Sequence, residues 1–380
     1  MRMNVSSPNS DENRIFVFDA KSGMILSRDV IAPDGFLIAT SGTRVDIDMI
    51  AKISNHHVLE IFVYKKLSPK PVKPLPVKAE PAKTEPENNM TYFEKVRQSE
   101  EFKQFQKQYD STVDDLKDQL NDIISRNSEI DTDRLLEHSI SIMSNHSTNL
   151  GVFDMLHSLR FHGDMTYTHS VNVSLISSII GQWLHFSEED INILALCGLL
   201  HDIGKLTIDD KLLNKPGKLT PEEFEIVKTH VKGGYNRIKD ADIDERIKEA
   251  CLLHHEKCDG SGYPFGLKSS QIPAFAKIVT IADIYDAMTA NRVYRGAVCP
   301  FDVIHIMEKD AFTTLDPTFA LPFLKNVVSS YIHTNVKLSN GQIGEVILIN
   351  DRDLSRPIVK CNDEFIDLSK TPGLTITAIM

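Results

Sequence analysis

A proline-rich segment near the start of the chain limits how the sequence can fold. Residues 67–90 contain the run SPKPVKPLPVKAEPAKTEPENN, in which prolines recur among lysines and glutamates. Proline lacks a backbone N–H and fixes its own φ angle, so this run supports neither a helix nor a central strand. Its charged side chains keep it solvated. We therefore expect an extended linker between a small N-terminal module and the rest of the 380-residue chain.

The segment before the linker is predicted to be a small α+β module. Short β-rich runs flank Pro33-Asp34-Gly35, a tripeptide typical of hairpin turns. A short helix is expected over residues 46–54 and a strand over residues 61–64. His56 and His57 are adjacent, but no acidic residue or cysteine stands at ligand spacing, so we interpret both as surface residues.

The pattern becomes helical from Thr91 and stays so to about residue 330. Apolar residues recur at helical spacing from Phe93 onward, and further helices are expected around residues 113–124, 133–143 and 149–159. The Met and Phe residues on these helices are interpreted as core.

The tail from Val336 changes to short alternating runs. Asn340-Gly341 stands between two of them, and this dipeptide favours a two-residue hairpin turn because both positions tolerate positive φ. A small C-terminal β unit is therefore expected.

Composition excludes several classes of function. A net charge of −11 disfavours a nucleic-acid polymer as partner. The longest apolar run, residues 191–200, is too short to span a bilayer, and the polar first 13 residues do not resemble a signal peptide. Five cysteines without a C-x-x-C pair indicate reduced thiols. We expect a cytoplasmic protein without membrane association.

Histidine and aspartate residues recur beside apolar helical stretches in the middle of the chain. His201-Asp202 ends the run LALCGLL, where an ionisable pair is costly to bury unless a partner or a metal neutralises it. The residues that share this setting are His169, His201, Asp202, His230, His254, His255 and Asp283. Imidazole with carboxylate is a donor set that suits Fe, Mn or Zn.

Each of these residues also has an ordinary structural explanation. A single His on an apolar helix face is usually a hydrogen-bonded core residue, and an Asp after a His can be a helix cap. Many separate burials of ionisable groups in one domain would be costly, however. The whole set favours a metal centre in which Asp202 and Asp283 supply the charge that holds two cations close together.

Three spaced segments resemble the HD-GYP family of the HD phosphohydrolase superfamily. LLHDIGKLTIDDKLLNKPGKLTPEE resembles the HD segment. HHEKCDGSGYPFGL, with Gly262-Tyr263-Pro264, is similar to the signature that separates HD-GYP phosphodiesterases from other HD proteins, and IADIYDAMTANRVYR resembles the D-x-x-D-A…R-x-Y-R/K segment. The resemblance runs from about Asn149 to Leu324, with the segments in the family's order.

This resemblance implies a role for each matched residue. The seven His and Asp residues above match metal-ligand positions, with Asp202 in the place of the bridging carboxylate. Lys205 matches a lysine that contacts the substrate phosphate, the alternative being a solvated charge at a helix end. Arg292 and Arg295 match positions that contact the nucleotide phosphates. Tyr263 either stacks on guanine or packs the loop.

The implied cofactors are two divalent transition metal ions, Fe or Mn. Two such ions about 3.5–4 Å apart lower the pKa of a bridging water and give hydroxide at neutral pH. That hydroxide attacks phosphorus while a metal and Lys205 offset charge on the non-bridging oxygens. The proton for the leaving 3′-oxygen comes from a metal-bound water or from Lys205; the sequence leaves this open.

Some positions depart from the family pattern. Trinuclear members carry a Glu one helical turn before the first His ligand, and here that position is Met165, a poor ligand for a hard cation. Asp164 is adjacent but points about 100° away on a helix. Two metals are therefore predicted. Val293 and Leu315 replace residues common in the family, and we interpret both as packing changes.

The predicted fold is mainly α, an all-helical HD-GYP domain with a small α+β module before it and a small β unit after it. The expected segments are a regulatory module (1–66), a linker (67–90), a helical lead-in (91–148), the HD-GYP domain (149–330) and the β unit (331–380). The lead-in helices have two interpretations, a homodimer seam or packing on the HD core.

The implied reaction is hydrolysis of cyclic di-GMP to pGpG, and the sequence leaves open whether a second hydrolysis gives GMP. 3′,3′-cyclic GMP-AMP is an alternative substrate, because the sequence does not show which residues meet the edge of the base. A non-catalytic cyclic-dinucleotide sensor, signalling to partner proteins through the GYP surface or the N-terminal module, is an alternative from another class. A different HD phosphohydrolase, such as a nucleotidase, is disfavoured by the intact GYP segment.

Overall fold

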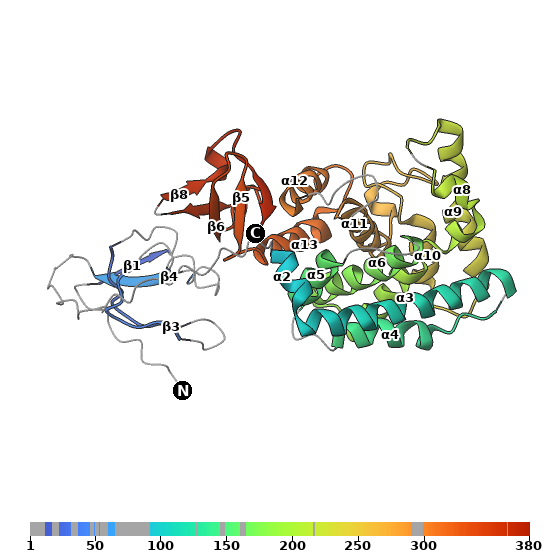
Figure 1. The fold of residues 1–380 in the computed structure, drawn as a ribbon, viewed down its shortest axis with the longest axis horizontal. Coiled ribbons are helices and arrows are strands. Elements are labelled where there is room, and N and C mark those ends of the chain that lie inside the picture. Colours follow the sequence, from blue (N-terminus) through green and yellow to red (C-terminus); the bar gives the residue numbers. More distant parts are fainter. Residues whose placement is uncertain are drawn as a thin grey trace. The chain divides into compact units, whose positions relative to one another are not determined.

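The computed structural model divides into two compact units, residues 1–88 and 89–380 (Figure 1). It describes residues 12–16, 23–31, 37–45, 49, 53, 60–64, 92–126, 128–144, 149–159, 165–215, 217–289, 299–362 and 364–380.

The first unit contains two antiparallel strand pairs. The pairs are β1 (Glu12–Phe16) with β4 (Glu60–Tyr64), and β2 (Val30–Ile31) with β3 (Leu37–Ala39). The predicted strand over residues 61–64 belongs to β4. The β2–β3 pairing agrees with the predicted hairpin, whose turn lies outside the described residues. Of the helix predicted over residues 46–54, the structure describes Met49 and Ile53, and both are helical. His56 and His57 lie outside the described residues. A separate apolar core of its own, which includes Leu26, Val45 and Ile61, holds this unit together.

The second unit is mainly helical, which confirms the predicted fold class. Its α-helices are α2 (Tyr92–Gln98), α3 (Glu100–Arg126), α4 (Thr132–Ser144), α5 (Asn149–Ser158), α6 (Met165–Trp183), α7 (Glu188–Leu200), α8 (Asp210–Leu213), α9 (Pro221–Ile238), α10 (Glu245–Leu253), α11 (Ala274–Thr289), α12 (Pro300–Asp310) and α13 (Pro317–Ser329). Short 3-10 helices are η2 (Ile203–Thr207), η3 (Ser269–Gln271) and η4 (Leu368–Lys370).

The long helix α3 lies beside α4 along one side of the helical body (Figure 1). A break at Ser99 separates α3 from α2: the Ser99 hydroxyl donates to the Val96 carbonyl and accepts from the Phe102 N–H. Phe102, Phe105 and Tyr109 recur at helical spacing and are all buried. This amphipathic face is why α3 packs on the helices behind it.

Helices α6 and α7 pack against each other at the centre of the unit. Their contact depends on Gly198, because a Cβ there would lie 2.4 Å from the Ser174 Cα. Residues with side chains therefore cannot replace Gly198 without moving a helix. The close approach brings the C-terminal end of α7 next to the first turns of α6, where the rings of His169 and His201 lie 5.2 Å apart.

The tail is a five-stranded antiparallel sheet in the order β8-β7-β6-β5-β9, which confirms the small β unit. The strands are β5 (Asn335–Leu338), β6 (Ile343–Leu348), β7 (Ile358–Cys361), β8 (Glu364–Asp367) and β9 (Ile376–Ile379). Asn340-Gly341 lies in the β5–β6 turn, with Gly341 at φ +88°. Buried residues of the sheet, such as Val336 and Val359, join the same apolar core as the helices. The segment boundaries predicted within this unit stay a prediction.

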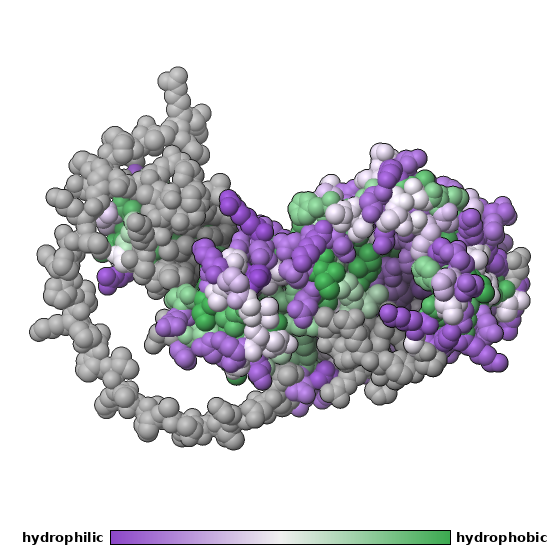
Figure 2. All heavy atoms as spheres, turned by 90° about the horizontal axis from the view of Figure 1, so that it is seen from above, coloured by the Kyte–Doolittle hydropathy of each residue, from purple (hydrophilic) through white to green (hydrophobic). Residues whose placement is uncertain are grey.

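Hydrophilic side chains cover much of the face of the second unit that Figure 2 shows. Among the described helices, none combines the length and the apolar character that crossing a bilayer requires.

Candidate metal centre

The seven predicted ligand residues come from separate elements and meet at one place in the second unit. Those residues are His169 on α6, His201 and Asp202 after α7, His230 on α9, His254 and His255 after α10, and Asp283 on α11. They form two groups, and within each group the candidate ligand atoms lie within 4.8 Å of one another. One group holds Asp202, His230, His254 and His255; the other holds His169, His201 and Asp283.

Asp202 lies between the two groups and turns one carboxylate oxygen to each. Its Oδ2 lies 3.2 Å from His201 Nε2 and 3.6 Å from His169 Nε2. Its Oδ1 lies 3.3 Å from His230 Nε2 and 3.7 Å from His254 Nε2. A carboxylate placed in this way can bind two cations at once, one through each oxygen.

Four buried polar atoms at this place lack hydrogen-bond partners. The atoms are His201 Nε2, His230 Nε2, His254 Nε2 and Asp202 Oδ1. An unpaired buried polar atom costs about 1–3 kcal/mol, so four at one point need a common explanation. The other buried side-chain atoms without partners, among the described residues, are serine hydroxyls. Imidazole nitrogens and carboxylate oxygens that converge in this way fit a divalent transition metal.

Backbone carbonyls fix the tautomer of three of the imidazoles. Nδ1 of His201 lies 2.8 Å from the Gly198 carbonyl oxygen, and Nδ1 of His230 lies 2.7 Å from that of Val227. Nδ1 of His254 lies 3.0 Å from the Ala250 carbonyl oxygen. A carbonyl can only accept, so each Nδ1 carries the proton and each Nε2 presents a lone pair.

A carboxylate takes the place of the carbonyl at His169. Its Nδ1 lies 2.7 Å from Asp286 Oδ2, and its Nε2 lies 3.0 Å from Asp283 Oδ1. Asp283 Oδ2 also lies 3.8 Å from His255 Nδ1. Asp283 and Asp286 are three residues apart on α11 and therefore face the same side.

Burial and charge set the protonation of this cluster. Burial lowers the pKa of His230 to about 4, so its ring is neutral near pH 7. Burial opposes ionisation of Asp202, but His201 and Lys205 hold the pKa of its carboxyl well below the usual value. Burial alone lowers the pKa of His169, but the hydrogen bonds to Asp283 and Asp286 outweigh it and raise the pKa to about 10. Carboxylates and neutral imidazoles are the states in which such groups bind metal, so a metal would have to displace the second proton of His169.

Lys205 and Tyr263 lie at the edge of this centre. The Lys205 ammonium donates a hydrogen bond to Asp202 Oδ2 and is partly exposed. The Tyr263 ring stacks on the His255 ring, with centroids 4.7 Å apart. One face of Tyr263 is therefore covered by a predicted metal ligand.

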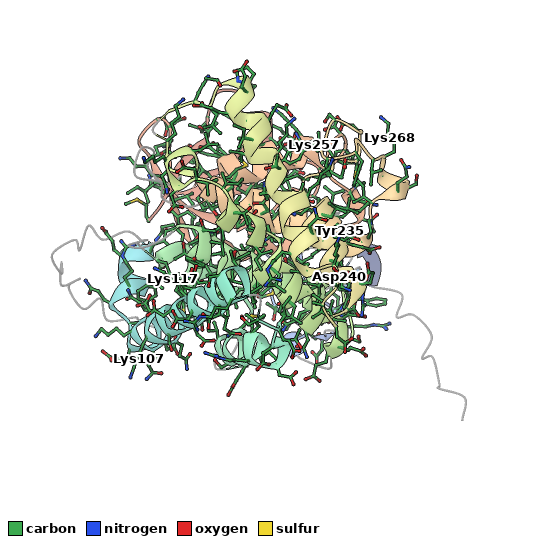
Figure 3. All side chains as sticks on the ribbon, turned by 90° about the vertical axis from the view of Figure 1, so that its right-hand side faces the viewer. Lys107, Lys117, Tyr235, Asp240, Lys257 and Lys268 are labelled. Atoms are coloured by element: carbon green, nitrogen blue, oxygen red, sulfur yellow. The ribbon has the colours of Figure 1, made fainter. Side chains whose placement is uncertain are left out.

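A buried carboxylate holds the loop that carries Tyr263. Glu256, which is 2% exposed, accepts hydrogen bonds from the Phe265 N–H at 2.7 Å and the Leu267 N–H at 2.8 Å. Gly262 approaches so closely that a Cβ would lie 2.5 Å from the His255 carbonyl oxygen. Lys257 and Lys268 are exposed, and the Lys268 ammonium donates to the Asp259 carbonyl within the loop (Figure 3).

Some predicted positions lie outside the described residues: Arg292, Arg295, Val293 and Asp164. Met165 begins α6, and its side chain is also outside the description. Leu315 is 3% exposed and packs in the main core. The substrate-binding roles of the two arginines therefore stay predictions.

Sequence reasoning missed Asp286, Asn172 and Glu256. Asp286 stands in the quoted run IADIYDAM, and its spacing from Asp283 was the available signal. Asn172 and Glu256 offered none, since their partners are distant in sequence or belong to the backbone of an irregular loop.

Comparison with known proteins assigns this region to a family. Residues 135–319 match the HD domain family. The chain is 36% identical over 203 residues to cyclic di-GMP phosphodiesterase PA4108 of Pseudomonas aeruginosa, covering 53% of this chain and 49% of that protein. It is 42% identical over 148 residues to a cyclic di-GMP phosphodiesterase of Thermotoga maritima, covering 38% and 40%.

A third relative is the 3′3′-cGAMP-specific phosphodiesterase 3 of Vibrio cholerae, 36% identical over 152 residues, covering 40% of this chain and 33% of that protein. The chain thus spans about half or less of the length of these relatives. The matched region contains the HD, GYP and D-x-x-D segments and all seven residues of the two ligand groups. Residues 135–319, just under half of the chain, therefore match the HD domain family, and the relatives that resemble this region include cyclic di-GMP phosphodiesterases.

Proposed function

We propose that this protein is a metal-dependent phosphodiesterase that hydrolyses cyclic di-GMP to pGpG, with GMP as the product if a second hydrolysis follows. The observation that carries the proposal is the position of Asp202 between two groups of ligand atoms, with three buried imidazole Nε2 atoms that lack any other partner. The names of the relatives from Pseudomonas aeruginosa and Thermotoga maritima support the substrate class.

Two divalent cations, Fe or Mn, are the proposed cofactors. His230, His254 and His255 would hold one, His169, His201 and Asp283 would hold the other, and Asp202 would bind both. Bound there, the cations would supply an activated water and offset charge on the phosphate.

The chain's own residues would orient the substrate. Lys205 stands beside Asp202 with its ammonium partly exposed, where it can donate to a phosphate oxygen. Arg292 and Arg295 are proposed to contact the second phosphate. Tyr263 is proposed to stack on a base. Its ring packs on His255, and the Lys228 ammonium lies 5.7 Å from its centroid.

3′,3′-Cyclic GMP-AMP is a second candidate substrate, because relatives from Vibrio cholerae carry that specificity in their names. Guanine and adenine differ in the hydrogen-bonding groups on their edges. Both present the same phosphodiester to the centre, so the proposed chemistry is the same for either.

The proposed setting is cytoplasmic. Proposed partners are a second copy of the chain and signalling proteins that bind the GYP surface or the N-terminal module.

The test is turnover by the purified full-length chain, loaded with Mn²⁺ or anaerobically with Fe²⁺. Cyclic di-GMP and cyclic GMP-AMP are supplied in parallel, and products are separated by chromatography. A His201→Ala/Asp202→Ala variant excludes a contaminant. Formation of pGpG or GMP by the wild type alone supports the proposal.

Absence of turnover with either metal, combined with retained nucleotide binding, would overturn it in favour of a non-catalytic sensor. Hydrolysis of cyclic GMP-AMP alone would replace the substrate and keep the reaction.

A further inference from the structure

An unbroken series of side-chain hydrogen bonds connects helix α3 to the candidate ligand His169. The Tyr109 hydroxyl lies 2.7 Å from Asn172 Oδ1, and Asn172 Nδ2 lies 2.7 Å from Asp286 Oδ1. The other carboxylate oxygen of Asp286 lies 2.7 Å from His169 Nδ1. Three helices, α3, α6 and α11, contribute to the series.

The middle of this series is closed to solvent. Tyr109 and Asn172 are each 2% exposed, and Asp286 is 6% exposed. The Tyr109 hydroxyl is also 3.1 Å from the Thr168 carbonyl oxygen, so the phenol lies against the turn of α6 that carries His169. Because water cannot replace a lost partner there, each hydrogen bond restricts the next one.

Donors and acceptors in the series can be arranged in only one direction. Burial, together with the nearby charge of Asp286, raises the pKa of the Tyr109 phenol well above its ordinary value, so the phenol is a donor. A carboxylate only accepts, so Asp286 selects the orientation of the Asn172 amide that turns its NH₂ to Asp286 and its oxygen to the Tyr109 hydroxyl. Both Asp286 oxygens then accept, one from Asn172 and one from His169 Nδ1–H.

That direction assigns Nδ1–H of His169 to Asp286, so Nε2, which faces Asp202 at 3.6 Å and Asp283 at 3.0 Å, is the nitrogen that a metal would bind after displacing its proton. The outer face of α3 has a different character: Lys107 and Lys117 on it are exposed (Figure 3). Among the described residues, α3 supplies none of the candidate ligands and is connected to His169 through the buried Tyr109 hydroxyl.

We infer that Tyr109 is a positioning residue for the metal centre, acting on His169 through Asn172 and Asp286. The inference rests on the proposed metal centre, but not on the identity of the substrate. If Tyr109 acts in this way, helix α3 contributes to metal affinity. This helix follows the predicted linker and α2 in the chain.

The test measures Mn²⁺ binding by the full-length, metal-stripped chain, following free Mn²⁺ by electron paramagnetic resonance. Asp286→Asn replaces one of the two acceptor oxygens with an NH₂ group and removes the charge beside His169, and it is expected to weaken Mn²⁺ binding about 10–100-fold. Tyr109→Phe removes one neutral hydrogen bond and is expected to weaken binding about 5-fold.

Tyr167→Phe is the matched control. Tyr167 is also buried, and its hydroxyl also joins α6 to α3, through Asn121 Oδ1 at 3.2 Å, but this contact lies outside the series. Its substitution is expected to leave Mn²⁺ affinity unchanged while lowering thermal stability as much as Tyr109→Phe does.

The double variant Tyr109→Phe/Asp286→Asn distinguishes a positioning role of Tyr109 from a general loss of stability. If Tyr109 acts through Asp286, Tyr109→Phe has no further effect on Mn²⁺ affinity in the Asp286→Asn background. Should Asp286→Asn fail to fold, Asn172→Leu interrupts the same series and takes its place in the cycle.

Equal Mn²⁺ affinities for Tyr109→Phe and Tyr167→Phe, or additive effects in the double variant, would overturn the inference. A wild type that binds no Mn²⁺ would overturn it together with the metal centre. Normal Mn²⁺ binding without turnover of any cyclic dinucleotide would refute the proposed function alone, and the affinity series would still decide the inference.

Discussion

Two kinds of support orient the imidazoles of the candidate centre. His201 and His230 each donate Nδ1–H to a carbonyl three residues earlier, and His254 does so to carbonyls three and four residues earlier. His169 instead donates to Asp286, which lies 117 residues away on α11. The first kind of support forms as soon as the local backbone is helical, whereas the second needs three helices to be in place.

Because of this difference, the two sides of the centre should respond differently to substitutions elsewhere in the molecule. The side with His230 and His254 depends on local backbone geometry that few substitutions elsewhere can disturb. The side with His169 depends on packing between α3, α6 and α11. Distant changes in the molecule should therefore act on the His169 side first.

The largest effect is expected from substitution of Asp202. Its carboxylate faces both ligand groups, so the difference between the two kinds of support does not affect this prediction. Asp202→Asn keeps the size of the side chain but removes the charge that faces both ligand groups. We expect the Mn²⁺ content of the purified protein to fall on both sides, and turnover of cyclic di-GMP to fall at least ~1,000-fold, or about 4 kcal/mol in the barrier.

The control for this change is Asp209→Asn. Asp209 caps α8, where its side chain accepts from the Lys211 N–H, a role that asparagine also fills. Metal content and turnover should match the wild type. Retention of one tightly bound metal by Asp202→Asn would show that the two sides are independent and that Asp202 does not bridge them.

Packing between α6 and α7 can be perturbed separately. Gly198→Ala places a methyl group 2.4 Å from the Ser174 Cα, so α7 must shift and carry His201 with it. We expect the free energy of unfolding to fall by about 3 kcal/mol and metal affinity to fall too.

Gly181→Ala is the matched substitution at the other end of the same pair of helices. Its methyl group would meet the flexible end of Leu194 at 2.8 Å, which can move aside. The loss should stay below about 1 kcal/mol, as urea unfolding of both variants would measure. Equal losses would mean that the helix backbones adjust freely and that His201 does not depend on this contact.

The loop that carries Tyr263 also depends on a buried carboxylate, that of Glu256, which binds backbone N–H groups and no candidate ligand. Glu256→Gln turns one of two acceptors into a donor that faces a backbone N–H. We expect kcat/KM for cyclic di-GMP to fall about 10-fold, with Mn²⁺ affinity unchanged, because the loop moves while the ligands stay.

Asp259→Asn is its control, since Asp259 accepts from the Ser261 N–H in the exposed part of the same loop. Little change in kcat/KM is expected there. A loss of Mn²⁺ affinity in Glu256→Gln would show that the loop and the centre are one unit.

Features of the centre that depend on local sequence could be predicted, whereas contacts between distant segments could not. The candidate ligands His201 and Asp202 follow an apolar helix, so their burial and their need for a partner could be predicted from local pattern. The helical body and the β5–β6 hairpin followed from periodicity and from Asn340-Gly341. Each of these features depends on neighbours in the chain.

Features that join distant segments could not be predicted. Asn172 lies on an apolar helix and gives no signal of its partners, Tyr109 and Asp286, because their proximity depends on how three helices pack. Gly198 stands in LALCGLL without any sign that α6 crosses it. Such contacts are properties of the tertiary arrangement, not of any one segment.

The buried imidazole of His157 is held by a third kind of partner, tyrosine hydroxyls. Its substitution has the smallest expected effect. Its Nε2 lies 3.0 Å from the Tyr285 hydroxyl and its Nδ1 3.3 Å from the Tyr331 hydroxyl, so it has neither a carbonyl nor a carboxylate as the partner. Burial lowers the pKa of His157 to about 4, whereas carboxylates raise that of His169. Substitution by Gln keeps a polar side chain there but removes the titration.

This pKa predicts how stability responds to acid. Between about pH 6.5 and pH 4 the unfolded chain binds a proton at His157 and the folded chain does not, so the free energy of unfolding decreases as the pH falls. On going from about pH 7.5 to about pH 5.5, the wild type should lose about 1 kcal/mol more than His157→Gln. Urea unfolding in the presence of a chelator measures both losses, and groups that titrate in both proteins cancel in the difference. Equal losses would mean that hydroxyl partners stabilise the protonated ring, and that a carboxylate is not what distinguishes His169 from His157.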